Sequence, residues 1–194
     1  MSSICVFCAS ALPKNPLFKE HTLQLAQILA EKDYTLVYGG AHVGLMGILA
    51  RRVMELGGKV VGIMPHSLTG REVASDDLTE KYLVSSMAER KRLMLERSQA
   101  LVVLPGGLGT MDEFWESVCL SSLGEERKSI ILINSGGFYN KLLAWTEEAY
   151  AEGLLALPFQ RYVSVIASPS QLEEALANFQ LPPIPSWVRL GDTK

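Results

Sequence analysis

The sequence lacks several features that would place a protein in a specialised class. It has no run approaching the ~20 apolar residues that a membrane span requires. Residues 1–8 contain no basic segment, and their apolar run is too short for a secretory signal. The 18 basic residues are outnumbered by 21 acidic ones, which gives no electrostatic reason to expect nucleic acid or an acidic membrane as a partner. We therefore expect a cytoplasmic protein, in which a local site can still bind a small anion.

Cysteine is scarce as well. Three cysteines form an odd number, which fits a reduced compartment. Cys5 and Cys8 have the spacing of a redox pair, but Val6-Phe7 between them favours a strand, and two cysteines cannot complete a structural zinc site. The chain also contains neither an H-E-x-x-H motif nor an H-x-E element with C-x-x-C. We predict buried strand cysteines, with no metal and no cofactor.

What the sequence does contain is an alternation of apolar strands and amphipathic helices. A length of 194 residues with 48% hydrophobic residues suits one domain with a substantial core. Short connections between alternating elements predict an α/β fold, namely a single-domain Rossmann-like doubly wound parallel sheet with helices on both faces. The nucleotide-binding domain would span residues 1–180, with an extended proline-rich tail over 181–194. The expected strands cover residues 4–7, 35–38, 59–64, 81–84, 101–104, 129–133 and 161–166.

The helices are predicted between these strands. Asn15-Pro16 should cap and open the first, and Gly57-Gly58 should end the second near residue 56. Later helices are expected over residues 87–97, to about 123, over 138–151 and over 169–179. Residues 65–80 form a long polar loop that could lie over a site.

Residues 101–113 form the most informative stretch. A short apolar strand leads into Pro105-Gly106-Gly107-Leu108-Gly109-Thr110 and then into a helix. Backbone amides at such a helix start attract anions, most often phosphate. Because Glu113 follows at once, a carboxylate would stand beside a phosphate site, which suggests chemistry as well as binding.

A second glycine-rich turn follows the strand at residues 35–38. Residues 39–47 do not have the G-x-G-x-x-G spacing, and the next strand ends in Met64-Pro65-His66 without the carboxylate that an NAD site requires. Neither turn is followed by the Gly-Lys-Ser/Thr of a P-loop. Two phosphate-suited turns favour a single nucleotide or sugar phosphate. The alternative is that the glycines only allow tight packing of strand against helix.

Glu113 and the helix at residues 87–97 each have an ordinary structural explanation. Thr110-x-x-Glu113 fits a capping box, in which Glu113 would only satisfy the start of its helix. Arg90, Met94 and Arg97 share one helix face, and a basic face is usually solvated. However, this helix precedes the fifth strand, so that its start can neighbour the glycine turn.

Taken together, these motifs resemble the LOG ("lonely guy") family of cytokinin riboside 5′-monophosphate phosphoribohydrolases. The family signature P-G-G-x-G-T-x-x-E is met by residues 105–113, and its upstream E/H-R-K-x-x-M element is met by residues 89–94. The family's Y-G-G-x-x-x-G-L-M-G is similar to residues 38–47. The likeness extends from residue 6 to residue 139, and three spaced motifs together are a specific signal.

The resemblance implies hydrolysis of the N-glycosidic bond of a purine nucleoside 5′-monophosphate, releasing free base and ribose 5-phosphate. Family members have also been labelled lysine decarboxylases, but no lysine setting typical of pyridoxal phosphate is apparent here. By the family pattern, Arg90 and Glu113 are the catalytic pair, and Glu72 contacts substrate from the variable loop. The remaining expected substrate contacts are Lys91, Gly107, Leu108, Gly109, Thr110, Met111 and Asp112, with further first-loop contacts from Ser10, Gly39, Gly40 and Met46.

Family likeness also suggests a homodimer. Trp115, Val118 and Leu120 could contribute to it, although ordinary core packing would account for at least two of them. Cys119 and Leu120 depart from residues common in plant and bacterial members, which bears on the base preference, cytokinin or adenine, more than on hydrolysis. The rival hypothesis is a non-catalytic nucleotide-binding sensor or carrier on the same fold.

Overall fold

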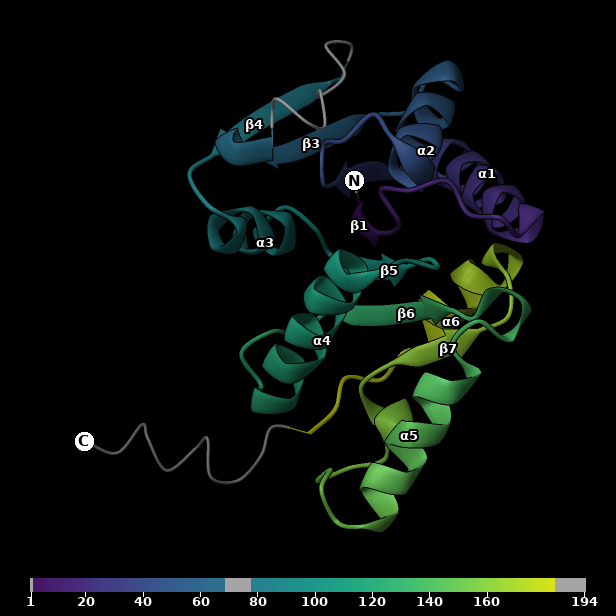
Figure 1. Ribbon diagram of the computed structural model, residues 1–194, viewed down its shortest axis with the longest axis vertical. Helices are drawn as coiled ribbons and strands as arrows, with labels where there is room; N and C mark the ends of the chain where they lie inside the picture. The colour runs from purple at the N-terminus through teal and green to yellow at the C-terminus, as the bar shows by residue number, and fades with distance from the viewer. Residues whose placement is uncertain (1, 69–77, 184–194) are drawn as a thin grey trace.

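A computed structural model describes residues 2–68 and 78–183 of the chain. Within these residues, seven strands form one parallel sheet in the order β4-β3-β2-β1-β5-β6-β7 (Figure 1), which confirms the predicted α/β class. The strands are β1 (Ser3–Phe7), β2 (Thr35–Tyr38), β3 (Val60–Pro65), β4 (Glu80–Val84), β5 (Ala100–Val103), β6 (Ser129–Ile133) and β7 (Ser164–Ile166).

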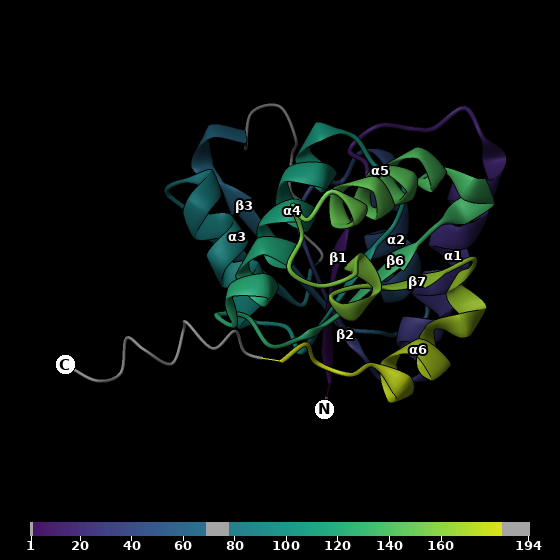
Figure 2. The same ribbon diagram turned by 90° about the horizontal axis from the view of Figure 1, so that it is seen from below.

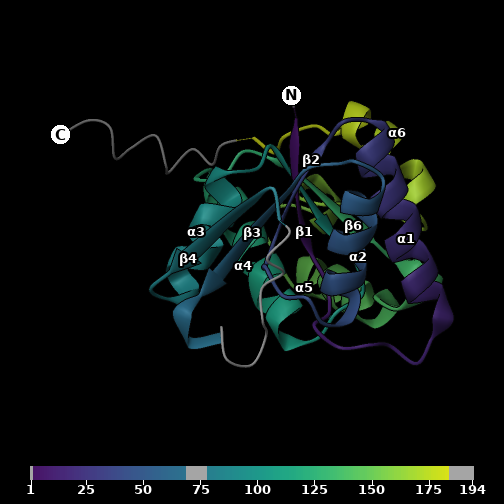
Figure 3. The same ribbon diagram turned by 90° about the horizontal axis from the view of Figure 1, so that it is seen from above.

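Helices cover both faces of the sheet, as predicted. One face carries α1 (Pro16–Glu31), α2 (Gly44–Glu55) and α6 (Leu172–Asn178); the other carries α3 (Met87–Glu96), α4 (Leu108–Leu123) and α5 (Asn140–Ala151). Figures 2 and 3 show α1, α2 and α6 gathered on one side of the sheet and α3 and α4 on the other. Because side chains alternate along a strand, Ile4 and Val6 of β1 join one core while Cys5 and Phe7 join the other.

The strand order reverses at β1. The chain runs outward from β1 through β2 and β3 to β4, then returns through α3 to place β5 on the other side of β1. In such sheets the connections on either side of the reversal diverge, so that a crevice opens beyond the carboxyl ends of β1 and β5. The turn before α4 follows β5, which places it at this crevice.

Several local predictions are confirmed. The Asn15 side chain accepts a hydrogen bond from the Leu17 amide at 3.0 Å and caps α1. Gly57, with φ of 78°, follows the end of α2. Cys5 and Cys8 are buried with free thiols, whose pKa values burial raises. In the part of the chain that the structure describes, every helix is too short or too polar to cross a bilayer.

The structure corrects the expected strand at residues 161–166. Residues 159–161 form a 3-10 turn that buries Phe159, and Tyr162 and Val163 are also buried in the core. Ladder pairing with β6 begins only at Ser164, which leaves a three-residue edge strand. Two further helix starts are also short 3-10 turns: residues 135–137 precede α5, and residues 169–171 precede α6.

Candidate active site

A pocket of about 270 Å³ opens at the reversal of strand order. Its lining comes from the segment after β1, the start of α2, the segment after β3, the start of α3 and the turn before α4. The lining residues are Cys8, Ala9, Ser10, Ala11, Met46, Leu68, Met87, Arg90, Gly107, Leu108, Gly109, Thr110 and Glu113. A larger cavity of about 360 Å³ lies beside β7 and α6, but it contains neither glycine turn and none of the predicted catalytic residues.

The turn before α4 presents unoccupied backbone to this pocket. Gly107 is the N-cap residue of α4, and its helix start receives no side-chain hydrogen bond. The amides of Leu108, Gly109 and Thr110 donate to no other residue in the described ranges. A Cβ added to Gly107 or Gly109 would meet nothing within 4 Å. Open space in front of unpaired amides is the arrangement that binds a phosphate.

The capping-box interpretation of Glu113 is wrong. A box would need Thr110 to be the N-cap residue, but α4 begins at Leu108, so that Thr110 is already the third helical residue. Thr110 is buried and packs over Gly106, where an added Cβ would stand 2.0 Å from its Oγ1. A capping box therefore does not account for Glu113, which lines the pocket.

Arg90 is held at the base of the pocket by backbone carbonyls. Its side chain is 7% exposed; Nη2 donates to the Gly39 carbonyl at 2.9 Å, and Nε donates to the Ile63 carbonyl at 3.1 Å. Gly39 directly follows β2 and Ile63 lies within β3, so carbonyls from two neighbouring strand segments fix the guanidinium. The solvated-face interpretation is therefore wrong for Arg90, although it is right for Arg97, whose exposed guanidinium lies over the Tyr82 ring.

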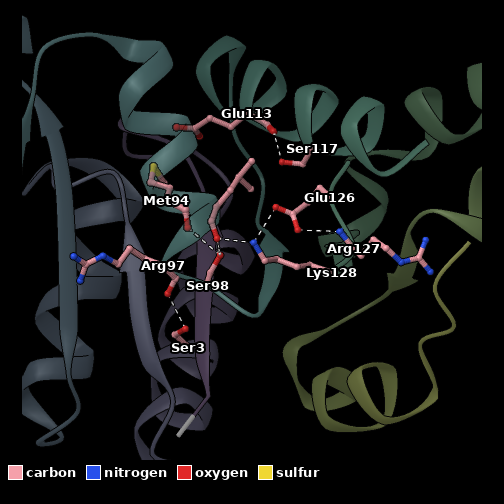
Figure 4. Close-up of polar contacts among 10 residues, drawn as sticks. Ser3, Met94, Arg97, Ser98, Glu113, Ser117, Glu126, Arg127 and Lys128 are labelled. Carbon is pink, nitrogen blue, oxygen red and sulfur yellow. Dashed lines mark hydrogen bonds and ion pairs between the residues drawn. The ribbon is translucent and has the colours of Figure 1, made fainter. Parts of the chain in front are cut away.

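Glu113 faces Arg90 across the gap between α4 and α3. Its carboxylate Oε1 lies 3.5 Å from Nη1 of Arg90, and its side chain is 9% exposed. Figure 4 shows that the other end of the residue is anchored, because the Ser117 hydroxyl donates to the Glu113 carbonyl at 2.8 Å. The structure thus brings the two predicted catalytic residues together in one water-accessible pocket.

Helix α3, which carries Arg90, is secured at both ends. At its start the Ser86 hydroxyl accepts a hydrogen bond from the Glu89 amide, and the Glu89 carboxylate accepts one from the Ser85 amide. The hydrogen bonds from Ser85 lower the pKa of the Glu89 carboxyl group. At its far end Lys128 Nζ donates to the Leu95 carbonyl at 2.7 Å. The position of Arg90 is therefore set by the helix as well as by the strands.

Tyr139 is a site residue that the sequence pattern did not reveal. Its buried hydroxyl donates to the Leu104 carbonyl at 2.9 Å, directly before the turn that leads into α4. Burial raises the pKa of this phenol. Because Tyr139 follows β6, far along the chain, only the resemblance over residues 136–139 could have drawn attention to it.

The first glycine turn is filled by the protein itself. A Cβ on Gly39 would stand 1.8 Å from Nη2 of Arg90, and one on Gly47 would stand 1.8 Å from the His42 carbonyl oxygen. The Met46 amide already donates to the Ala9 carbonyl at 3.2 Å. Among the expected first-loop contacts, Ser10 and Met46 line the pocket, whereas Gly39 and Gly40 are buried and are not part of its lining.

Other expected contacts lie elsewhere. Lys91 and Asp112 are paired with each other at 3.0 Å and do not line the pocket. Met111 packs against the core on the α4 side, and Glu72 lies outside the described residues. Of the three apolar α4 residues, Val118 is buried, while Trp115 and Leu120 pack half-buried against the same core.

Fold and site together define a Rossmann-like α/β protein with an open anion-binding turn and a buried Arg–Glu pair.

Comparison with known proteins agrees with the motifs. The family model described as possible lysine decarboxylase matches residues 46–176. Cytokinin riboside 5′-monophosphate phosphoribohydrolase LOG7 of Arabidopsis thaliana is 38% identical over 170 residues, covering 88% of this chain and 77% of the relative. The probable phosphoribohydrolase LOGL5 of Oryza sativa subsp. japonica is 38% identical over 93% and 73%. The chain belongs to the LOG family.

Solved structures with lower identity share the fold. The molybdenum cofactor binding protein of Rippkaea orientalis superposes with a TM-score of 0.68 at 22% identity, covering 91% of this chain and 95% of its own. The molybdenum cofactor carrier protein of Chlamydomonas reinhardtii gives 0.65 at 18% identity, over 91% and 99%. At these identities the likeness concerns the fold alone.

Proposed function

We propose that this chain hydrolyses the N-glycosidic bond of a purine nucleoside 5′-monophosphate, either AMP or a cytokinin-type nucleotide, to free base and ribose 5-phosphate. The observation that carries the proposal is the convergence, in one pocket, of the open turn at residues 107–110 with Arg90 and Glu113. The names of the LOG-family relatives support the same reaction class.

In this proposal the 5′-phosphate binds the amides at the start of α4. Those amides, aided by the positive end of the helix dipole, would fix the ribose so that C1′ faces Glu113. Positioning of this kind can lower a barrier by several kcal/mol, up to about 7–11 kcal/mol in ideal cases. Glycosidic cleavage passes through an oxocarbenium-like state, and a carboxylate beside C1′ can stabilise that positive charge or orient the attacking water.

Arg90 then acts mainly on Glu113. Two of its nitrogens donate to the Gly39 and Ile63 carbonyls, and the third, Nη1, contacts the Glu113 carboxylate and the Met87 sulfur. At 3.5 Å the pair is longer than a tight charge-assisted hydrogen bond of about 2.7–2.9 Å. In this proposal Arg90 orients the Glu113 carboxylate through an ion pair that is not a tight hydrogen bond.

A direct assay tests the proposal and identifies the base. Purified protein is incubated separately with AMP and with isopentenyladenosine 5′-monophosphate, and free base is quantified by chromatography. Release of base in step with ribose 5-phosphate is the expected result, and the better substrate reveals the preferred base. Saturable binding of nucleotide without base release would support the sensor or carrier hypothesis instead.

The Glu113→Gln variant tests the carboxylate. Glutamine keeps the size and can still accept from Arg90, so we expect a folded protein whose turnover falls by at least ~100-fold, in the range found when one stabilising group is removed. Arg90→Ala is a less clean test, because it leaves the Gly39 and Ile63 carbonyls without their donor. Native turnover by folded Glu113→Gln would remove Glu113 from the mechanism.

A further inference from the structure

A second set of ion pairs joins α3 to α4 directly beside the Arg90–Glu113 pair. Lys91 Nζ lies 3.0 Å from Oδ2 of Asp112 and also forms an ion pair with Glu116. Asp112 and Glu116 are four residues apart on α4, so their side chains share one face and converge on the same ammonium group. We call Lys91, Asp112 and Glu116 the outer latch.

The outer latch and the catalytic pair occupy matching positions on the two helices. Arg90 and Lys91 are consecutive on α3, and Asp112 and Glu113 are consecutive on α4. Consecutive helical residues point about 100° apart. Arg90 and Glu113 therefore meet inside the pocket, while Lys91 and its carboxylates meet on the outer side. Any sliding of one helix along the other would disturb both contacts together.

The two contacts differ in tightness. The inner pair is separated by 3.5 Å, whereas Lys91 makes a hydrogen-bonded ion pair with Asp112 at 3.0 Å. The Lys91 side chain is only 16% exposed. Its partial burial lowers the pKa, but hydrogen bonds to Glu116 and Asp112 outweigh that effect and raise the pKa overall. The Lys91 ammonium group is thus charged at neutral pH, and the outer latch is a closer contact than the inner pair.

We propose that Lys91 is a positioning residue, which through Asp112 and Glu116 holds α3 and α4 in the register that sets the Arg90–Glu113 geometry. This inference rests on the proposed function. It differs from the expectation that Lys91 binds the nucleotide. Lys91 does not line the pocket, and a phosphate brought to its ammonium group would meet the carboxylates of Asp112 and Glu116.

A double-mutant cycle tests the inference. The variants are Lys91→Met, the pair Asp112→Asn with Glu116→Gln, and all three together. If Lys91 acts only through the two carboxylates, kcat should fall by about 10- to 100-fold in the first two, as for a misplaced catalytic group. The triple variant should lose no more kcat than the Lys91→Met variant or the double variant loses, because each of those already removes the interaction between Lys91 and the carboxylates.

Further readouts separate positioning from binding and from general destabilisation. We expect both KM and the inhibition constant of inorganic phosphate to change less than threefold. A threefold change corresponds to about 0.65 kcal/mol at RT of 0.59 kcal/mol. Lys91→Arg, which can pair with the same carboxylates, should retain most of the turnover. Arg92→Met is the matched control, because Arg92 is an exposed residue of the same helix and pairs with Glu96 within α3. Its kinetics should stay native, and thermal melts should show all variants folded at the assay temperature.

Three results would overturn the inference. One is a raised KM and weaker phosphate inhibition in Lys91→Met while the Asp112→Asn, Glu116→Gln variant stays native, since Lys91 would then bind substrate. Another is additive losses in the triple variant. The third is native kinetics throughout. Failure of the proposed function looks different: the wild-type protein itself would then release no base from any nucleotide.

Discussion

The two glycine-rich turns of this protein are alike in sequence and opposite in use. Both follow a strand and open a helix, and both meet near the reversal of strand order. The turn after β2 is occupied by the protein's own atoms: Arg90 fills the space at Gly39, and the His42 carbonyl fills the space at Gly47. The turn after β5 leaves open space at Gly107 and Gly109 and lines the pocket.

The difference teaches that a glycine motif has two separate physical explanations within one site. At the first turn glycine is required because no Cβ fits, so the constraint is internal packing. At Gly107 and Gly109 of the second turn a Cβ has open space, so packing within the folded protein does not explain these two glycines. A ligand that approaches the backbone would explain it, which is why the second turn is our candidate for the phosphate.

The largest expected effect comes from breaking the filled turn. Alanine at Gly39 would place a Cβ 1.8 Å from Nη2 and 2.9 Å from Cζ of Arg90, so the guanidinium must leave its site. The Glu113 carboxylate would then lose its buried partner. Breaking a buried ion pair costs about 3–5 kcal/mol, and we expect a loss of that order in the free energy of unfolding, together with loss of turnover. Urea denaturation of the Gly39→Ala variant measures the first effect, and native stability would contradict the packing explanation.

A smaller effect of opposite sign is expected at the open turn. Gly109 lies in the first turn of α4, and among the described residues no side chain or other segment stands within 4 Å of a Cβ added there. Because glycine within a helix costs about 0.5–1 kcal/mol relative to alanine, Gly109→Ala should match or exceed the native stability. The added methyl group would nevertheless crowd a phosphate at the amides, so KM for the nucleotide should rise. An unchanged KM would mean that the phosphate binds elsewhere.

The smallest effect should come from a buried pair outside the residues of both turns. His21 Nδ1 lies 2.7 Å from the Ser135 hydroxyl, and burial lowers the pKa of His21. The unfolded chain therefore binds a proton at a higher pH than the folded one, so stability should decrease as pH falls through about 6.5, the ordinary histidine value. Thermal melts between pH 5 and 7.5 should show a weaker pH dependence in His21→Gln than in the native protein. An equal dependence in both proteins would assign the titration to another group.

Much of the fold follows from local sequence signals. The alternation of apolar strands with helices predicted the parallel sheet, and Asn15 and Gly57 marked helix ends because capping depends on nearest neighbours. The same reasoning failed at residues 161–166, because burial of Phe159, Tyr162 and Val163 by a 3-10 turn is a tertiary effect that strand propensity does not register.

By itself, the sequence determined the fold class, the glycine turn before α4 and the membership in the LOG family, which three spaced motifs indicate. Only the tertiary structure decided what individual residues contact. Arg90 and Lys91 are adjacent in the chain, yet one is buried against the β2 and β3 carbonyls while the other closes the outer latch. The reason is physical: a motif specifies residue types along the chain, whereas helix rotation and packing decide which side chain faces the pocket. Packing likewise decides that the glycine turn after β2 is filled by protein atoms while the turn after β5 is open.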